Sequence, residues 1–157
     1  MATKRARRGV LGALAVVALA ASGCGDGTPT PVAGAVASTS THATSHDLTV
    51  TLADFTVRAS RPVLAPGTYQ LTISNRGSVE HELLVFHTEL APSALPMTNG
   101  DVNEDGPGVN KISDGDNVAP GASQTRAVDL SAPGTYLFVC NIPGHFHAGM
   151  VQAITVR

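Results

Sequence analysis

Three residues whose side chains bind soft metal ions recur at intervals of five near the C-terminal end: Cys140, His145 and Met150. Strand-like stretches, residues 134–139 and 151–156, precede and follow them, so the three side chains share one loop between two strands. Thiolate, imidazole and thioether donors suit copper, whereas magnesium and calcium prefer oxygen. The spacing therefore predicts a mononuclear copper site whose fourth ligand comes from elsewhere in the chain.

His81 is the candidate for this fourth ligand. It follows a turn at residues 75–78 and lies in an alternating apolar and polar run, residues 79–87, which predicts a strand. A histidine near the end of such a strand lies at the rim of a β-sandwich, beside the ends of other strands. We expect His81 to meet the loop there.

The loop contains two histidines, His145 and His147, and either could supply the second imidazole. Pro143 and Gly144 precede His145 and allow the chain to turn back toward Cys140. His147 lies only three residues before the methionine. We therefore predict that His145 binds the metal and that His147 lies beside the site, partly exposed.

The composition favours short strands and turns: 157 residues include 16 glycines, 10 prolines and no tryptophan. No stretch shows a convincing helical period. Strand-like alternation occurs in residues 48–52, 55–59, 68–73, 79–87, 124–130, 134–140 and 150–156. Such strands, separated by Pro-Gly turns, predict an all-β fold, a Greek-key sandwich or barrel of about eight strands.

The pentapeptide Ala-Pro-Gly-Thr-Tyr occurs twice, at residues 65–69 and 132–136. Proline and glycine form the turn, and the tyrosine begins a strand with its hydroxyl free to bond the backbone. Each repeat predicts a tyrosine corner of the kind that β-sandwiches use for stability.

Residues 91–118 interrupt the β pattern and are acidic, with Lys111 as their only basic residue. The start of this segment resembles a calcium loop, but Ile112 stands where such a loop needs a bidentate glutamate. We expect a solvated acidic loop with a helical turn near residues 92–95.

Residues 1–23 have the features of a signal peptide: basic residues, then an apolar stretch too short for a stable membrane anchor. Small residues before Cys24 resemble a bacterial lipoprotein processing site, so we expect a lipid on Cys24. The pair Arg7-Arg8 also resembles a twin-arginine signal, and an ordinary signal peptide is the remaining alternative. In each case we expect export, and lipidation would anchor the protein at the outer face of the cytoplasmic membrane.

Residues 24–46 have little charge and no periodicity, which predicts a flexible linker before a folded domain at residues 47–157. From Cys24 onward, six Lys and Arg oppose twelve Asp and Glu. This acidic balance argues against a nucleic-acid partner, since phosphate contacts rely on basic side chains. With Cys24 committed to a lipid, Cys140 has no disulfide partner, and metal ligation explains its presence outside the cytoplasm.

Residues 47–157 resemble the cupredoxins, the small blue copper proteins. The resemblance rests on Asn75-x-Gly77 followed by His81, and on Tyr136-x-Phe138-x-Cys140-x4-His145-x4-Met150. The Cys-x4-His-x4-Met spacing looks closer to auracyanin-like and azurin-like members than to plastocyanin. The resemblance implies an eight-stranded Greek-key sandwich that holds one type 1 copper ion. His81, Cys140 and His145 would be the trigonal ligands and Met150 the long axial one.

Relatives commonly have asparagine directly after the first ligand histidine, bonded to a hydroxyl residue after the cysteine. Here these positions are Glu82 and Asn141. We predict that an Asn141 amide donates to the Glu82 carboxylate and keeps this cross-strand link beside the ligands.

The resemblance implies a non-enzymatic, monomeric electron carrier whose redox partners dock near His145, on an apolar surface of Pro143, Phe146 and Ala148. The alternative is a protein that delivers or buffers copper for a membrane oxidase. Its features would be the linker and the additional histidines: His42, His46, His87 and His147. A catalytic copper domain, as in nitrite reductases, would need further ligands from a second domain. This chain is too short to supply one, but a partner chain could supply it.

Overall fold

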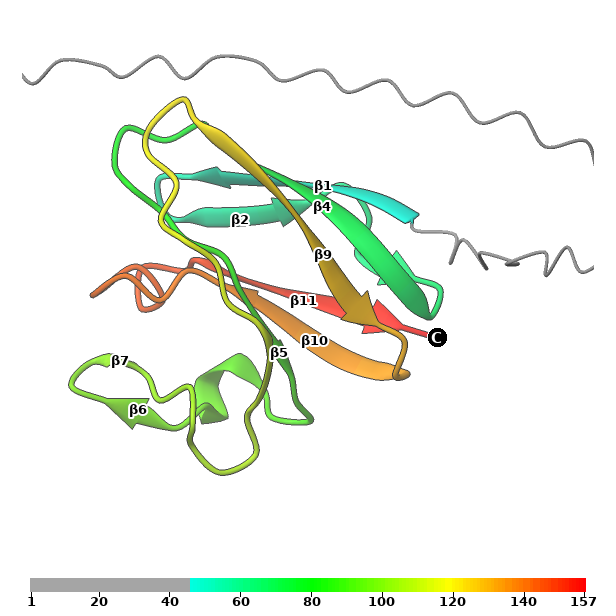
Figure 1. Cartoon of the computed structure of the whole chain (residues 1–157). Helices are drawn as coiled ribbons and strands as arrows, with labels where there is room; N and C mark the ends of the chain where they lie inside the picture. The colour runs from blue at the N-terminus through cyan, green and yellow to red at the C-terminus, as the bar shows by residue number, and fades with distance from the viewer. Residues whose placement is uncertain (1–45) are drawn as a thin grey trace, which may run out of the picture. The chain divides into compact units, whose positions relative to one another are not determined.

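The computed structural model of the protein describes residues 46–157, and these form two main β-sheets in two layers (Figure 1). The first sheet contains, in spatial order, β2 (Thr56–Ala59), β1 (His46–Ala53), β4 (Gly67–Asn75) and β9 (Ser123–Leu130). The second contains β3 (Val63–Leu64), β11 (Val151–Val156), β10 (Gly134–Val139), β5 (Leu84–His87) and β8 (Asn110–Ser113). The predicted signal peptide, Cys24 and His42 lie outside the described residues.

The chain passes repeatedly between the two sheets, from β4 to β5, from β8 to β9 and from β9 to β10. β1 pairs in parallel with β4, and β3 in parallel with β11, while the other strand pairs are antiparallel. These crossings are typical of a Greek-key sandwich. The predicted all-β fold class is confirmed, and the described strands do not close into a barrel. No helix within residues 46–157 has the length and apolar character of a membrane span.

Alternating apolar side chains of both sheets fill the inner core between the layers. Leu48, Val50 and Leu52 of β1 are buried, while the residues between them face outward or are half-buried. Successive side chains of a strand point to opposite faces, so this alternation places every second residue in the core. The same pattern in β4 and at the end of β9 makes the first sheet apolar on one face only.

The second sheet is buried on both faces in its centre. Tyr136 and Phe138 of β10 point into the inner core, whereas Leu137 and Val139 point into a second, outer core cluster. A strand buried on both faces has a continuous apolar run instead of alternation, as β10 does. Some other part of the chain must therefore cover the outer face of this sheet.

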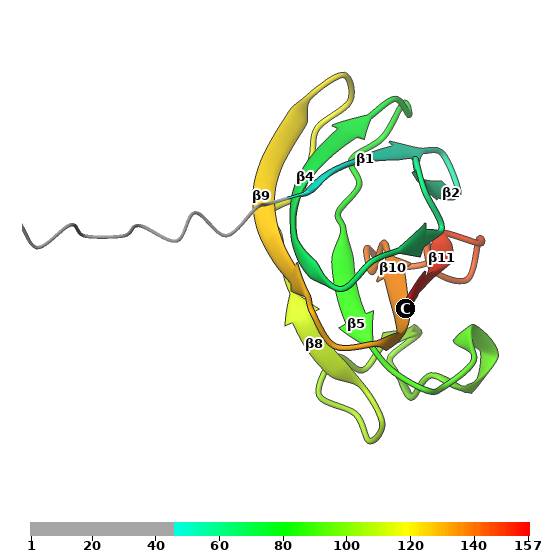
Figure 2. The ribbon, with the colours of Figure 1, turned by 90° about the vertical axis from the view of Figure 1, so that its right-hand side faces the viewer.

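That cover is the acidic segment, which is more ordered than the predicted solvated loop. The expected helical turn is present as a 3-10 helix, η1 (Pro92–Ala94), and it is followed by a short hairpin of β6 (Met97–Thr98) and β7 (Asp101–Val102). Leu95 and Val102 are buried in the outer core cluster. β8 then pairs with β5 and becomes an edge of the second sheet (Figure 2). The segment is predicted to be solvated because it is acidic, but its few buried apolar residues pack against the second sheet.

The predicted strand at residues 79–87 is shorter than expected, because β5 begins only at Leu84. His81 instead forms an isolated bridge with Val118, in which each residue donates its N–H to the carbonyl of the other, at 3.2 and 2.6 Å. Residues 79–83 pass from the first sheet to the second here, so a continuous ladder is impossible. The break leaves His81 between the two layers.

Both predicted tyrosine corners are confirmed. The buried Tyr69 hydroxyl donates to the Ala65 carbonyl at 2.9 Å, and the buried Tyr136 hydroxyl donates to the Ala132 carbonyl at 3.0 Å. Each repeat therefore fixes the start of one strand, β4 in the first sheet and β10 in the second.

Replacing either tyrosine by phenylalanine keeps the ring and removes only this hydrogen bond. We expect Tyr69→Phe and Tyr136→Phe each to lower the free energy of unfolding by about 1 kcal/mol. Urea denaturation of the metal-free protein measures the change. The two variants serve as controls for each other, because the two corners have the same sequence. An unchanged midpoint and slope in both would show that the corners do not stabilise the fold.

Candidate metal centre

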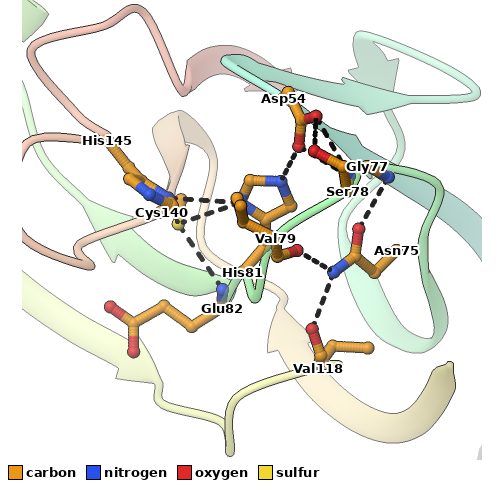
Figure 3. Close-up of polar contacts among 10 residues, drawn as sticks. All are labelled: Asp54, Asn75, Gly77, Ser78, Val79, His81, Glu82, Val118, Cys140 and His145. Atoms are coloured by element: carbon orange, nitrogen blue, oxygen red, sulfur yellow. Dashed lines mark hydrogen bonds and ion pairs between the residues drawn. The ribbon is translucent and has the colours of Figure 1, made fainter. Parts of the chain in front are cut away.

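Three predicted ligands meet at one end of the sandwich. His81 Nδ1 lies 3.2 Å from His145 Nδ1, and Cys140 Sγ lies 3.4 Å from His145 Nδ1 and 4.0 Å from His81 Nδ1 (Figure 3). His81 and Cys140 are fully buried and His145 is half-buried. Residues separated by 59 positions in the chain thus direct their donor atoms at one point.

A metal ion fits this triangle. The point equidistant from the three donor atoms lies about 2.1 Å from each, and zinc, an ion of similar size to copper, binds imidazole and thiolate at roughly 2.0 to 2.3 Å. Two imidazoles and a thiolate with a weak axial methionine are the donor set of blue copper sites. The residues present therefore suit copper.

Backbone hydrogen bonds fold the ligand loop back on itself. The Cys140 N–H donates to the Met150 carbonyl at 3.0 Å, and the Met150 N–H donates to the His145 carbonyl at 3.1 Å. Gly144 has a φ of 84°, a left-handed conformation that glycine adopts without strain. This is the predicted turn toward Cys140. Met150 follows at the end of the loop, and its side chain is completely buried in the inner core.

The structure separates the two histidines of the loop. His145 faces Cys140 and His81, whereas His147 is exposed and lies beside the Phe146 ring, with centroids 5.9 Å apart. Phe146 itself is half-buried and packs against the outer core cluster. Of the predicted apolar surface, Pro143 and Ala148 are exposed, and Phe146 contributes less than expected.

Asn75, the first residue of the Asn75-x-Gly77 motif, ties down the segment that carries His81. Its buried side-chain amide donates to the carbonyls of Val79 and Val118 at 2.7 and 2.8 Å, and its oxygen accepts from the Gly77 N–H at 2.8 Å. Because the His81 backbone also bridges to Val118, the motif fixes both sides of this segment.

Burial dominates the acid-base properties of the centre. It raises the pKa of the Cys140 thiol, and the Glu82 N–H, which donates to the sulfur at 3.5 Å, opposes this rise. Burial and the nearby His81 together lower the pKa of His145. Both effects favour uncharged side chains in the metal-free protein, and a bound cation would favour the thiolate.

Glu82 and Asn141 are linked, but not through the Asn141 side chain as predicted. The backbone N–H of Asn141 donates to Glu82 Oε1 at 2.9 Å. The side-chain amide instead bonds Val102, accepting from its N–H at 2.8 Å and donating to its carbonyl at 3.0 Å, and donates to Glu104 at 3.1 Å. The prediction was wrong about the donor because the acidic segment, expected in solvent, lies within reach of Asn141. Burial raises the pKa of the Glu82 carboxyl, and the Asn141 N–H opposes this rise.

Two residues of the turn after β1 reach the site without any sequence signal linking them to it. Asp54 Oδ1 lies 3.2 Å from His81 Nε2, on the side of the ring away from Cys140 (Figure 3). The Phe55 ring is 52% exposed and lies edge-on to His145, with centroids 6.1 Å apart. Phe55 has a φ of 65°, an unusual conformation for a bulky residue. Sequence reasoning missed both residues because neither belongs to the ligand pattern.

Replacing the two loop histidines separately distinguishes their roles. We expect His145→Ala to reduce copper affinity by more than the roughly 10- to 100-fold that loss of an outer hydrogen-bond partner costs, because it removes a direct donor. We expect His147→Ala to leave affinity and the visible copper–thiolate absorption unchanged. Competition with a copper chelator and visible spectroscopy measure both. Equal losses in the two variants would contradict the assignment.

Comparisons with known proteins identify a copper-binding family. Residues 37–157 match the family described as copper binding proteins of the plastocyanin/azurin family. The copper-resistant cuproprotein CopI of Rubrivivax gelatinosus is 35% identical over 92 residues, which are 57% of this chain and 52% of CopI. The chain therefore spans about half the length of this curated relative.

Two solved structures share the fold. Reduced auracyanin from Roseiflexus castenholzii is 21% identical with a TM-score of 0.55, covering 73% of this chain and 98% of that one. Rusticyanin from Thiobacillus ferrooxidans is 18% identical with a TM-score of 0.51, covering 73% and 79%. With a family match over most of the sequence and a donor set suited to copper, the chain belongs to the plastocyanin/azurin family, the cupredoxins, and binds one copper ion.

Proposed function

We propose that this copper-binding protein carries single electrons between redox partners and has no enzymatic activity of its own. The observation that supports this most strongly is the triangle of His81, Cys140 and His145, whose donor atoms the fold brings to within 3.2 to 4.0 Å of one another. Copper, when bound, supplies a one-electron couple. Ligands that the surrounding fold holds in place rearrange little between the two oxidation states, which is what a carrier needs.

In this proposal, electrons enter and leave through His145. It is the only one of the three clustered ligands that is not fully buried. Exposed Pro143 and Ala148 on its loop, with Phe55 beside its ring, surround it with an apolar surface. A partner that docks on this surface comes closest to the metal there. We propose that the protein docks as a monomer.

The second candidate is copper delivery or buffering, and the similarity to a copper-resistant cuproprotein favours it. The additional described histidines give it little support. His46 lies against Tyr69 and His87 stacks on Tyr136, with ring centroids 5.0 and 4.5 Å apart. Of the additional histidines within residues 46–157, His147 is the one that lies on the ligand loop, and it is exposed. We therefore rank electron transfer first.

Copper retention during redox cycling separates the two functions. We expect the copper-loaded protein, reduced and reoxidised beside a Cu⁺ chelator, to recover nearly all of its visible absorption, because His81 and Cys140 are buried and shield the ion. Visible absorption and chelator-bound copper are measured at each step. Transfer of the copper to the chelator on reduction would favour delivery over electron transfer.

We further propose that the protein works at the outer face of the cytoplasmic membrane, held by a lipid on Cys24. Cys24→Ser should release the exported protein into the soluble fraction, since it removes the attachment site. Cys140→Ser is the matched control, because it removes the other cysteine and should leave the protein at the membrane. Fractionation of a bacterial host shows both. A Cys24→Ser protein that stays in the membrane fraction would overturn the lipid anchor.

A further inference from the structure

The two ring nitrogens of His81 face different partners (Figure 3). Nδ1 points toward His145 Nδ1 and Cys140 Sγ, whereas Nε2 lies 3.2 Å from Asp54 Oδ1. The His81 side chain is completely buried, so no water competes for Nε2. A carboxylate accepts hydrogen bonds only, which assigns the proton to Nε2 and leaves the lone pair of Nδ1 free for the metal.

Asp54 is held in place by hydrogen bonds that do not involve His81. The Ser78 N–H lies 2.9 and 3.0 Å from the two carboxylate oxygens, and the Ser78 hydroxyl donates to Oδ2 at 2.6 Å. An aspartate carboxyl group is ionised at neutral pH, and these bonds hold it in one orientation although the side chain is 36% exposed.

Gly77 leaves the space that this contact needs. A Cβ at this position would lie 2.2 Å from Asp54 Oδ1 and 2.7 Å from His81 Nε2, closer than real Cβ atoms approach. Any side chain at position 77 would therefore push the carboxylate and the imidazole apart. Gly77 and Ser78 therefore both support the hydrogen bond between Asp54 and His81: Gly77 leaves the space for it, and Ser78 orients the carboxylate.

We propose that Asp54 is a positioning residue that acts through His81 to favour Cu²⁺ over Cu⁺. Its carboxylate fixes the His81 tautomer and places a negative charge behind the ring, which makes Nδ1 a stronger donor. A negative charge stabilises the doubly charged ion more than the singly charged one. Asp54 therefore lowers the reduction potential of the bound copper. The inference rests on copper binding and is independent of which proteins exchange electrons.

Asp54→Asn tests the charge, because the amide keeps the shape and an oxygen acceptor. We expect its Cu²⁺ affinity to fall about tenfold, at the lower end of the range for an outer partner of a ligand, while its Cu⁺ affinity changes little. A tenfold difference between the two affinities raises a one-electron potential by about 59 mV. Spectroelectrochemistry of the copper-loaded protein measures the potential, and chelator competition measures each affinity.

Glu80→Gln is the matched control. It removes one negative charge next to His81 in the chain, but Glu80 bonds Asn117 and no ligand. We expect its potential to stay at the wild-type value. If Asp54→Asn shifts the potential no more than Glu80→Gln does, the proposed electronic role is wrong.

The tautomer is tested without copper. We expect ¹⁵N NMR of the metal-free protein to show His81 with its proton on Nε2 in the wild type, and a mixture of tautomers in Asp54→Ala. A single Nε2–H tautomer in Asp54→Ala would overturn the positioning role. Should Asp54→Ala not fold, Gly77→Ala replaces it, since its Cβ would separate the Asp54 carboxylate from His81 Nε2 and leave the charge in place. Gly77→Ala should then show the mixture, and an unchanged tautomer would count against the proposal.

Discussion

The metal centre depends on three lone-pair donors that the fold holds close together. Two imidazole nitrogens and a sulfur lie within 4.0 Å of one another, and His81 and Cys140 are fully buried. Each donor is therefore fixed by bonds made elsewhere: Cys140 by the end of β10, His145 by the backbone of its loop, and His81 by its bridge to Val118. The sandwich thereby brings His81 to the loop that carries Cys140 and His145.

The two core clusters contribute differently to holding the ligands in place. The inner core packs the sheets together and contains Cys140 and Met150, so the metal centre is an extension of it. The outer core fixes the acidic segment against the second sheet and, through Val102, reaches Asn141, the residue after the cysteine. Cys140 thus follows β10, which is buried on both faces. It precedes Asn141, whose backbone N–H and side chain both form hydrogen bonds. Little freedom remains at the sulfur.

Much of this was predictable because it is local in the chain. The Cys140, His145 and Met150 spacing lies in one loop, the tyrosine corners repeat one pentapeptide, and alternation marks the strands of the first sheet. The missed features are those decided by three-dimensional proximity. Asp54 lies 27 positions from His81 and has no motif of its own, and the acidic residues of the outer layer concealed Leu95 and Val102. The spacing of apolar residues along the sequence does not predict such contacts, because they depend on how the layers pack.

The bridge between His81 and Val118 also bears on when the metal centre forms. The bridge joins residues that are 37 positions apart, and Cys140 lies a further 22 positions along the chain. Each contact of His81 with these two residues therefore closes a long loop. Contacts between distant residues cost chain entropy that packing elsewhere must offset. In an unfolded chain, His81 is therefore far from the loop that carries Cys140, His145 and Met150. The complete set of ligands comes together only in the compartment in which the protein folds.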